Sequence, residues 1–238
     1  MAIFKIIRVS PSILPIDYKN KEVVAETVKQ LDKAGANMIH FDVMDGKFVE
    51  QKTFDYRLVD YCRNLTSLLL DVHLMVKSPE KVVDKYLQAG ADIITVHYEA
   101  FKDVKVLEDT LLKIKAKNVL AGVAISPSTP AYKLKDLLKA DLVDVVVVMG
   151  VEPGDYGREF IPGSAEKVAE VREMDKNVYI EIDGGVTLKN AKILRHVGAN
   201  ILVSGSTIFN SKNMKNTIRQ LKGNDYGNQI RNFFAKNK

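Results

Sequence analysis

The sequence has a single cysteine and no long run of apolar residues. Cys62 is the single cysteine among 238 residues, which excludes a disulfide framework within the chain and a cysteine-rich zinc site. No segment approaches the ~20 apolar residues of a membrane-spanning helix, and the apolar run at the start is too short for a signal peptide. We therefore expect no membrane partner, a cytoplasmic location and a core held together by apolar packing.

Neither positive nor negative charge is in large excess. The net charge is +5, from 35 Lys and Arg against 30 Asp and Glu, and the basic residues are interleaved with acidic ones along the expected helices. Nucleic-acid binding usually needs basic residues gathered on one face. We expect no nucleic-acid partner and only a modest attraction for anionic substrates.

No feature of the chain marks a domain boundary. It has no linker rich in Pro, Gly or Ser and no low-complexity run, and its 46% hydrophobic and 27% charged residues are ordinary for a globular protein. We predict a single domain over residues 1–238, in which residues 225–238 form a terminal helix or a frayed tail.

Short β-branched runs alternate with longer stretches whose apolar residues recur three or four apart. This alternation is typical of parallel βα units, and eight units can be counted. Eight units and a length near ~250 residues favour a (β/α)8 TIM barrel, with a doubly wound open sheet as the alternative. The expected strands are Ile6–Val9, Met38–Val43, Leu69–Leu74, Ile93–His97, Leu120–Ile125, Val143–Met149, Val178–Asp183 and Ile201–Val203. The expected helices include Glu22–Ala34, Pro79–Ala89, Val104–Lys117, Ala165–Met174 and Leu188–Val197.

Four ionisable residues lie toward the C-terminal ends of three expected strands, where such barrels place their active sites. They are His40, Asp42, His73 and Asp183. Two imidazoles and two carboxylates that converge there would form a four-ligand site suited to zinc, iron, manganese or cobalt. A lone histidine would usually be a hydrogen-bonded core residue, but four such side chains at strand ends favour a metal site.

Two further histidines have simpler explanations. His97 also ends an expected strand, but it has no obvious partner among the four metal-site residues, so we expect it to have a supporting or structural role. His196 lies near the C-terminal end of an expected helix, where a cation is favoured by the helix dipole.

Glycine-rich loops follow the last three expected strands and indicate a phosphorylated substrate. Backbone N–H groups in the loops after the last two strands of a TIM barrel often bind phosphate. Residues 153–158 resemble a mobile flap, with Arg158 as an additional phosphate contact. Methionines at strand ends usually fill a core, but here they could also form a dry wall of the site. The substrate-binding candidates from these loops and strand ends are Met44, Met75, Met149, Gly154, Gly157, Gly184, Gly185, Gly205 and Ser206.

Six segments between about Val9 and Phe209 resemble the ribulose-phosphate 3-epimerase family. They are Ser10-Pro-Ser-Ile-Leu14, His40-Phe-Asp-Val-Met-Asp-Gly46, Asp71-Val-His-Leu-Met75, Gly90-Ala-Asp-Ile-Ile-Thr-Val-His97, Met149 to Gly154, and Glu181-Ile-Asp-Gly-Gly185. The resemblance implies a barrel of the ribulose-phosphate-binding type that interconverts D-ribulose 5-phosphate and D-xylulose 5-phosphate. It also implies that the protein forms a homo-oligomer.

The same resemblance assigns roles to particular residues. One divalent metal, with zinc favoured, would be held by His40, Asp42, His73 and Asp183. Asp42 and Asp183 would also act as the acid/base pair around a metal-stabilised 2,3-enediolate. Ser12 and His73 would touch the substrate.

Three loops depart from the family pattern and leave the identity of the sugar open. Glu50-Gln51 replaces Pro-Asn, Ser126-Pro-Ser-Thr-Pro130 replaces Asn-Pro-Gly-Thr-Pro, and Pro153-Gly-Asp-Tyr-Gly-Arg158 replaces Pro-Gly-Phe-Gly-Gly-Gln. The alternatives are a 3-epimerase of a hexulose 6-phosphate such as allulose 6-phosphate, or a non-catalytic sugar-phosphate sensor. A related lyase is disfavoured because no Asp-x-Lys-x-x-Asp pattern starts at Asp71. A nicotinamide-dependent enzyme is disfavoured because no Gly-x-Gly-x-x-Gly follows the first strand.

Overall fold

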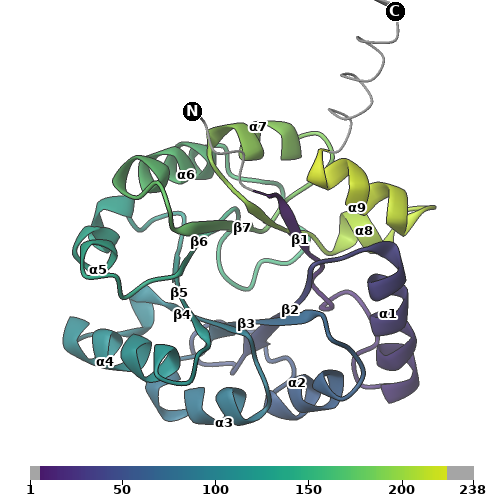
Figure 1. Ribbon diagram of the computed structural model, residues 1–238, viewed down its shortest axis with the longest axis horizontal. Helices are drawn as coiled ribbons and strands as arrows, with labels where there is room; N and C mark the ends of the chain where they lie inside the picture. The colour runs from purple at the N-terminus through teal and green to yellow at the C-terminus, as the bar shows by residue number, and fades with distance from the viewer. Residues whose placement is uncertain (1–5, 224–238) are drawn as a thin grey trace, which may run out of the picture.

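Eight parallel strands form one sheet that curls into a barrel, with helices around it (Figure 1). The computed structural model describes residues 6–223, so the predicted terminal helix or tail at 225–238 lies outside the described residues. The order of the strands is β1-β8-β7-β6-β5-β4-β3-β2, and the TIM-barrel prediction is confirmed. The strands are β1 (Arg8–Ser10), β2 (Met38–Met44), β3 (Leu69–Met75), β4 (Ile93–His97), β5 (Leu120–Ile125), β6 (Val145–Met149), β7 (Tyr179–Asp183) and β8 (Ile201–Val203).

The barrel closes between β1 and β2 through a bond from the Asn37 N–H to the Val9 carbonyl of β1, at 3.2 Å, and through two bonds beyond the end of β1. Proline has no N–H, so the regular ladder stops at Ser10, just before Pro11. The His40 N–H donates to the Pro11 carbonyl at 3.0 Å, and the Ile13 N–H donates to the His40 carbonyl at 3.2 Å. These bonds set Ser12 beside His40 at the mouth of the barrel.

Helices alternate with the strands and bury one face each against them. The α-helices are α1 (Lys21–Ala34), α2 (Tyr56–Arg63), α3 (Val83–Gln88), α4 (Val104–Lys115), α5 (Lys135–Lys139), α6 (Gly163–Met174), α7 (Ala191–Val197), α8 (Ser206–Phe209) and α9 (Met214–Lys222), and the 3-10 turns are η1 (Pro79–Lys81), η2 (Tyr98–Ala100) and η3 (Ala131–Leu134). Within residues 6–223, no helix is long and apolar enough to cross a bilayer. Cys62 lies on the buried face of α2, and burial raises the pKa of its thiol to about 12, as expected of a structural thiol.

Several predicted element boundaries differ from the structure by a few residues: β1 begins at Arg8 and not at Ile6, and α7 begins at Ala191 and not at Leu188. Two other differences have local reasons. The strand that was expected to begin at Val143 begins at Val145. The Ala121 N–H donates to the side-chain carboxylate of Asp144 at 2.9 Å in place of a backbone carbonyl, so the regular ladder starts after Asp144. The expected helix over Pro79–Ala89 is divided into η1 and α3, with Val82 between them at φ −118° and ψ −17°. Neither difference moves a strand end that carries a candidate site residue.

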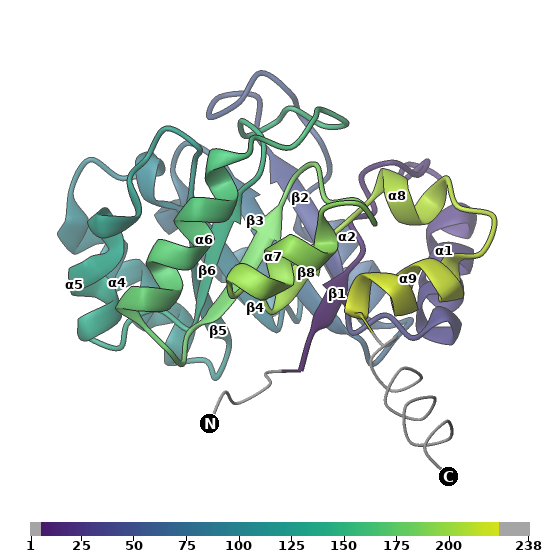
Figure 2. The same cartoon turned by 90° about the horizontal axis from the view of Figure 1, so that it is seen from above.

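Alternation along the strands separates an outer core from an inner one. Ile39, Phe41 and Val43 of β2 point outward into the large core beneath the helices. A smaller apolar cluster lies inside the barrel, and its members are Met38, Ile93, Ala124, Val145, Val147, Met149 and Ile201. The next two inward positions of β2 are His40 and Asp42, so ionisable side chains enter the barrel interior toward its C-terminal mouth. In the side view, the long loops after β2 and β6 rise above this mouth (Figure 2).

Candidate metal centre and active site

The four predicted metal-site residues meet at the mouth of the barrel. Asp42 and His73 are register partners on β2 and β3, and Asp183 reaches the same point from β7. His40 Nε2 lies 3.4 Å from Asp42 Oδ1 and 3.5 Å from Asp183 Oδ2, while His73 Nδ1 lies 3.2 Å from Asp183 Oδ2. One ligand atom from each of the four lies within 4.8 Å of the others, and all four residues are buried. Such a group could hold one metal ion.

The hydrogen bonding of His40 shows that the site suits a cation. His40 Nδ1 lies 2.8 Å from Asp71 Oδ2, and an ionised carboxylate can only accept, so the neutral His40 ring carries its proton on Nδ1 and a lone pair on Nε2. That Nε2 atom is buried and has no hydrogen-bond partner within residues 6–223. A buried polar atom without a partner is costly, and a metal ion at the four-residue cluster would satisfy it.

The electrostatics of the centre also favour a positive charge. Burial opposes the charged form of His40, but Asp71, Asp42 and Asp183 outweigh it and hold its pKa well above the usual range. Burial likewise opposes ionisation of Asp183, yet the charge of His40, whose Nε2 lies 3.5 Å from Asp183 Oδ2, and the hydrogen bond of His73 lower the Asp183 pKa. The carboxylates around these imidazoles therefore stabilise a cation at this point, whether a proton or a metal ion.

Asp71 and Glu181 belong to this centre, although the sequence reasoning gave them no role. Ser10 Oγ donates to Asp71 Oδ2 at 2.8 Å, so this carboxylate accepts from both Ser10 and His40. Burial and the neighbouring Asp71 hold the pKa of Glu181 well above its usual range. A period-two pattern could have revealed both, because each lies two residues before a candidate ligand on the same inward face.

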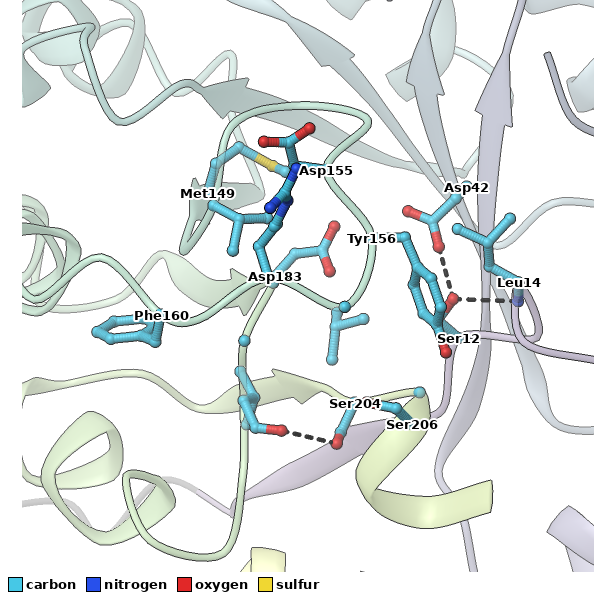
Figure 3. A pocket seen from close by; sticks show the side chains of 18 of the residues that line it. Ser12, Leu14, Asp42, Met149, Asp155, Tyr156, Phe160, Asp183, Ser204 and Ser206 are labelled. Atoms are coloured by element: carbon cyan, nitrogen blue, oxygen red, sulfur yellow. Dashed lines mark hydrogen bonds between the residues drawn. The ribbon is translucent and has the colours of Figure 1, made fainter. Parts of the chain in front are cut away.

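A pocket opens directly above the metal centre (Figure 3). With the exception of His73, which lies beneath it, every predicted catalytic and substrate-binding residue contributes to its lining. The lining includes Ser12, Asp42, Met44, Met75, Met149, Gly154, Gly157, Asp183, Gly184, Gly185, Gly205 and Ser206. Arg158 and Lys189 also line it, and the sequence reasoning missed the lysine, which follows the glycine pair by four residues.

Ser12 orients one of the two pocket carboxylates. Its hydroxyl donates to Asp42 Oδ2 at 2.5 Å and accepts from the Leu14 N–H at 3.3 Å (Figure 3). The backbone bonds that close the barrel around Pro11 are what bring this serine to the pocket. Ser12 therefore links barrel closure to the geometry of Asp42.

The glycine pair after β7 adopts a conformation that other residues avoid. Gly184 has φ +101° and Gly185 has φ +66°. A Cβ at Gly185 would lie 2.7 Å from both Cα and N of Phe160, which is too close for a non-bonded carbon atom. The tight loop thus requires glycine and brings backbone to the edge of the pocket.

The flap and the loop after β2, which both depart from the family pattern, touch each other. A Cβ at Gly154 would lie 2.7 Å from Gln51 Oε1 and 3.1 Å from Val49 Cβ. Tyr156 lies in the pocket on the Asp42 side (Figure 3). Burial and the Asp42 carboxylate raise the pKa of its phenol, while a hydrogen bond with Ser206 opposes them. Two of the three divergent loops therefore meet, and one of them, the flap, lines the pocket.

Comparison with known proteins agrees with this geometry. The model of the ribulose-phosphate 3 epimerase family matches residues 8–209. The chain is 41% identical over 218 residues to the chloroplastic ribulose-5-phosphate-3-epimerase of Arabidopsis thaliana, covering 90% of this chain and 75% of that one. It is 38% identical over 222 residues to the ribulose-phosphate 3-epimerase of Bacillus subtilis, covering 91% of this chain and 99% of that one. The crystal structure of 3-hexulose-6-phosphate synthase from Salmonella typhimurium has a TM-score of 0.69 at 13% identity, covers 91% of this chain and 97% of that chain, and supports the fold alone. The chain therefore belongs to the ribulose-phosphate 3-epimerase family and is an epimerase.

Proposed function

We propose that this protein interconverts D-ribulose 5-phosphate and D-xylulose 5-phosphate. The observation that carries the proposal is the pair of carboxylates, Asp42 and Asp183, which reach one pocket from β2 and β7 (Figure 3). The family match and the names of the Arabidopsis and Bacillus relatives support the choice of substrate.

Two carboxylates on opposite sides of a substrate are what inversion of a carbon requires. The hydrogen on C3 is acidic because it is next to the C2 carbonyl, and its removal by one carboxylate leaves a 2,3-enediolate. The other carboxylic acid then delivers a proton to the opposite face, and the two exchange roles in the reverse direction. Positioned general acids and bases of this kind contribute ~10²–10⁴-fold each. Ser12 keeps Asp42 oriented for this task through its hydroxyl.

His40, Asp42, His73 and Asp183 would hold one divalent metal ion. When bound, the ion supplies Lewis-acid neutralisation of the negative charge that develops on the substrate oxygens. We favour zinc, with iron, manganese or cobalt as alternatives, because a nitrogen and oxygen ligand set accepts all of them.

The opposite end of the pocket provides a site for the phosphate. The loops at Gly184, Gly185, Gly205 and Ser206 bring backbone to this end, and Lys189 and Arg158 add positive charge. Met44, Met75 and Met149 are almost completely buried and give the pocket an apolar wall. An apolar wall excludes water and strengthens the electrostatic interactions of the reacting groups.

The direct test is turnover of D-ribulose 5-phosphate by purified protein before and after chelation, and again after zinc, iron or manganese is added back. We expect turnover within the usual ~1–10³ per second of enzymes, loss on chelation and recovery with metal. Folded, metal-loaded protein that turns over neither pentose phosphate would contradict the proposal. Binding of these sugars without turnover would identify the sensor instead.

A 3-epimerase of a hexulose 6-phosphate is the second candidate, because the loop at residues 153–158 departs from the family pattern and lines the pocket. Tyr156 of this loop narrows the pocket beside Ser206, which should disfavour the longer sugar. Tyr156→Ala is expected to shift the ratio of kcat/KM toward the six-carbon ketose phosphate by ~10-fold, since pocket size discriminates by such factors. Steady-state kinetics on both sugars measure the ratio. Tyr132→Ala is the control, since Tyr132 is 64% exposed and does not line this pocket. An unchanged ratio in Tyr156→Ala would show that this side chain does not select the sugar.

Three broader features complete the proposal. All eight strands belong to one sheet, which supports a single domain over the whole chain. A homo-oligomer in the cytoplasm is proposed from the family resemblance. A relative from Oryza sativa, 34% identical over 223 residues, is named a cytoplasmic isoform.

A further inference from the structure

The two imidazoles of the metal centre are held in different ways. His40 is bonded directly to the Asp71 carboxylate at 2.8 Å. His73 instead directs Nε2 to a second imidazole, and His73 Nε2 and His97 Nε2 lie 2.9 Å apart. The two rings are nearly parallel, at an interplanar angle of 17°. His97, the histidine without a partner in the sequence reasoning, is thus in contact with a candidate metal ligand.

A carboxylate stands at the far end of this contact. His97 Nδ1 lies 3.1 Å from Glu99 Oε2. The other oxygen, Glu99 Oε1, accepts the Ser126 N–H at 2.8 Å and the hydroxyl of Thr129. His97 is fully buried, and the Phe48 ring packs against it with centroids 4.8 Å apart. His97 and Glu99 therefore have little freedom to adopt another arrangement.

The direction of the hydrogen bonds follows from what each group can do. A carboxylate only accepts, so His97 must donate from Nδ1 to Glu99, which leaves His97 Nε2 as an acceptor. His73 must then donate from Nε2, and its Nδ1 keeps a lone pair. That Nδ1 atom lies 3.2 Å from Asp183 Oδ2, within the metal cluster.

We propose that His97 and Glu99 are positioning residues for the metal centre: Glu99, acting through His97, keeps the proton of His73 on Nε2 and its Nδ1 free to bind the metal. If the chain of bonds ran the other way, His73 would carry its proton on Nδ1 and donate it to Asp183. One metal ligand would then be lost, although every side chain would remain in place. The inference rests on the proposed metal site and is independent of which ketose phosphate is the substrate.

Glu99→Gln tests the inference with almost no change of shape. The Ser126 N–H can only donate, so the glutamine must turn its carbonyl toward Ser126 and its amide NH2 toward His97 Nδ1. This reverses the chain of bonds. We expect the metal dissociation constant, measured by competition with a chromophoric chelator, to rise ~10–100-fold, as is typical when a group supporting a metal ligand is changed. The thermal unfolding of the metal-free protein reports whether the fold is intact.

A second variant separates this effect from a structural one. In His97→Gln, the new side-chain carbonyl can accept from His73 Nε2 whatever stands at position 99. The effect of Glu99→Gln on metal affinity should therefore disappear when His97→Gln is already present. If Glu99 only supports the loop after β5, Glu99→Gln will weaken metal binding equally in both backgrounds, and the inference is wrong.

Nitrogen-15 NMR of the zinc-loaded, unsubstituted protein examines the same point without any variant. The expected tautomers are Nε2–H for His73 and Nδ1–H for His97. A His97 ring protonated on Nε2 would overturn the inference even if the protein turns over its sugar. Conversely, the expected tautomers in a protein without epimerase activity would leave this inference standing and contradict the proposed function alone.

Discussion

Replacing Asp183 with asparagine is expected to lower kcat for epimerisation by ~10³-fold or more at saturating metal, because an amide cannot take up or release the proton. Metal binding is expected to weaken as well, since Asp183 contributes a carboxylate oxygen to the buried cluster. Steady-state kinetics and metal competition measure the two effects separately. Asp60→Asn makes the same chemical change at an exposed position on α2 and should alter neither.

The two pocket carboxylates can be told apart by hydrogen exchange. In deuterated water, the Asp183→Asn variant with metal bound should still exchange the C3 hydrogen of one pentose phosphate through Asp42. Asp42→Asn should exchange the C3 hydrogen of the other, because each carboxylate serves one face of the carbon. Proton NMR follows the loss of each C3–H signal. A fully active Asp183→Asn variant would contradict the two-carboxylate mechanism. Exchange of the C3 hydrogen of the same sugar by both variants would also contradict it.

Gly185→Ala is expected to raise KM for the phosphorylated substrate by ~100-fold. The backbone at this position has φ +66°, and the added Cβ would lie 2.7 Å from the backbone of Phe160, so the loop must move. Moving it would break the hydrogen bonds that we propose between backbone N–H groups of this loop and the phosphate. Bonds to a charged group contribute ~1.5–3 kcal/mol each, so loss of one or two accounts for a change of this size. Kinetics with the sugar phosphate give the KM.

Gly35→Ala is the matched control for this prediction. Gly35 ends α1 with φ +79°, and a Cβ there would have nothing within 4 Å. The substitution creates the same kind of backbone strain, worth ~1–2 kcal/mol of stability, without touching the pocket. It should lower the melting temperature and leave KM unchanged. A folded Gly185→Ala variant with normal KM would show that the substrate phosphate does not bind at this loop.

The sequence alone determined the features that depend on short-range patterns. Eight repeats of a β-branched run and an apolar helical stretch specify the barrel, because each unit must bury one face against its neighbours. Period-two alternation and the position of strand ends bring His40, Asp42, His73 and Asp183 to one mouth. These rules act over a few residues at a time, so they can be read without knowing which strands pair.

The tertiary structure alone decided the contacts between strands and loops distant in the chain. His97 lacked a partner in the sequence because His73 lies 24 residues away, and Glu99 reaches Ser126 across 27 residues. The meeting of Gln51 with Gly154 likewise depends on how two loops rise from β2 and β6. Such pairings follow from strand register and barrel closure, which are set by packing of the whole core, and no local pattern encodes them.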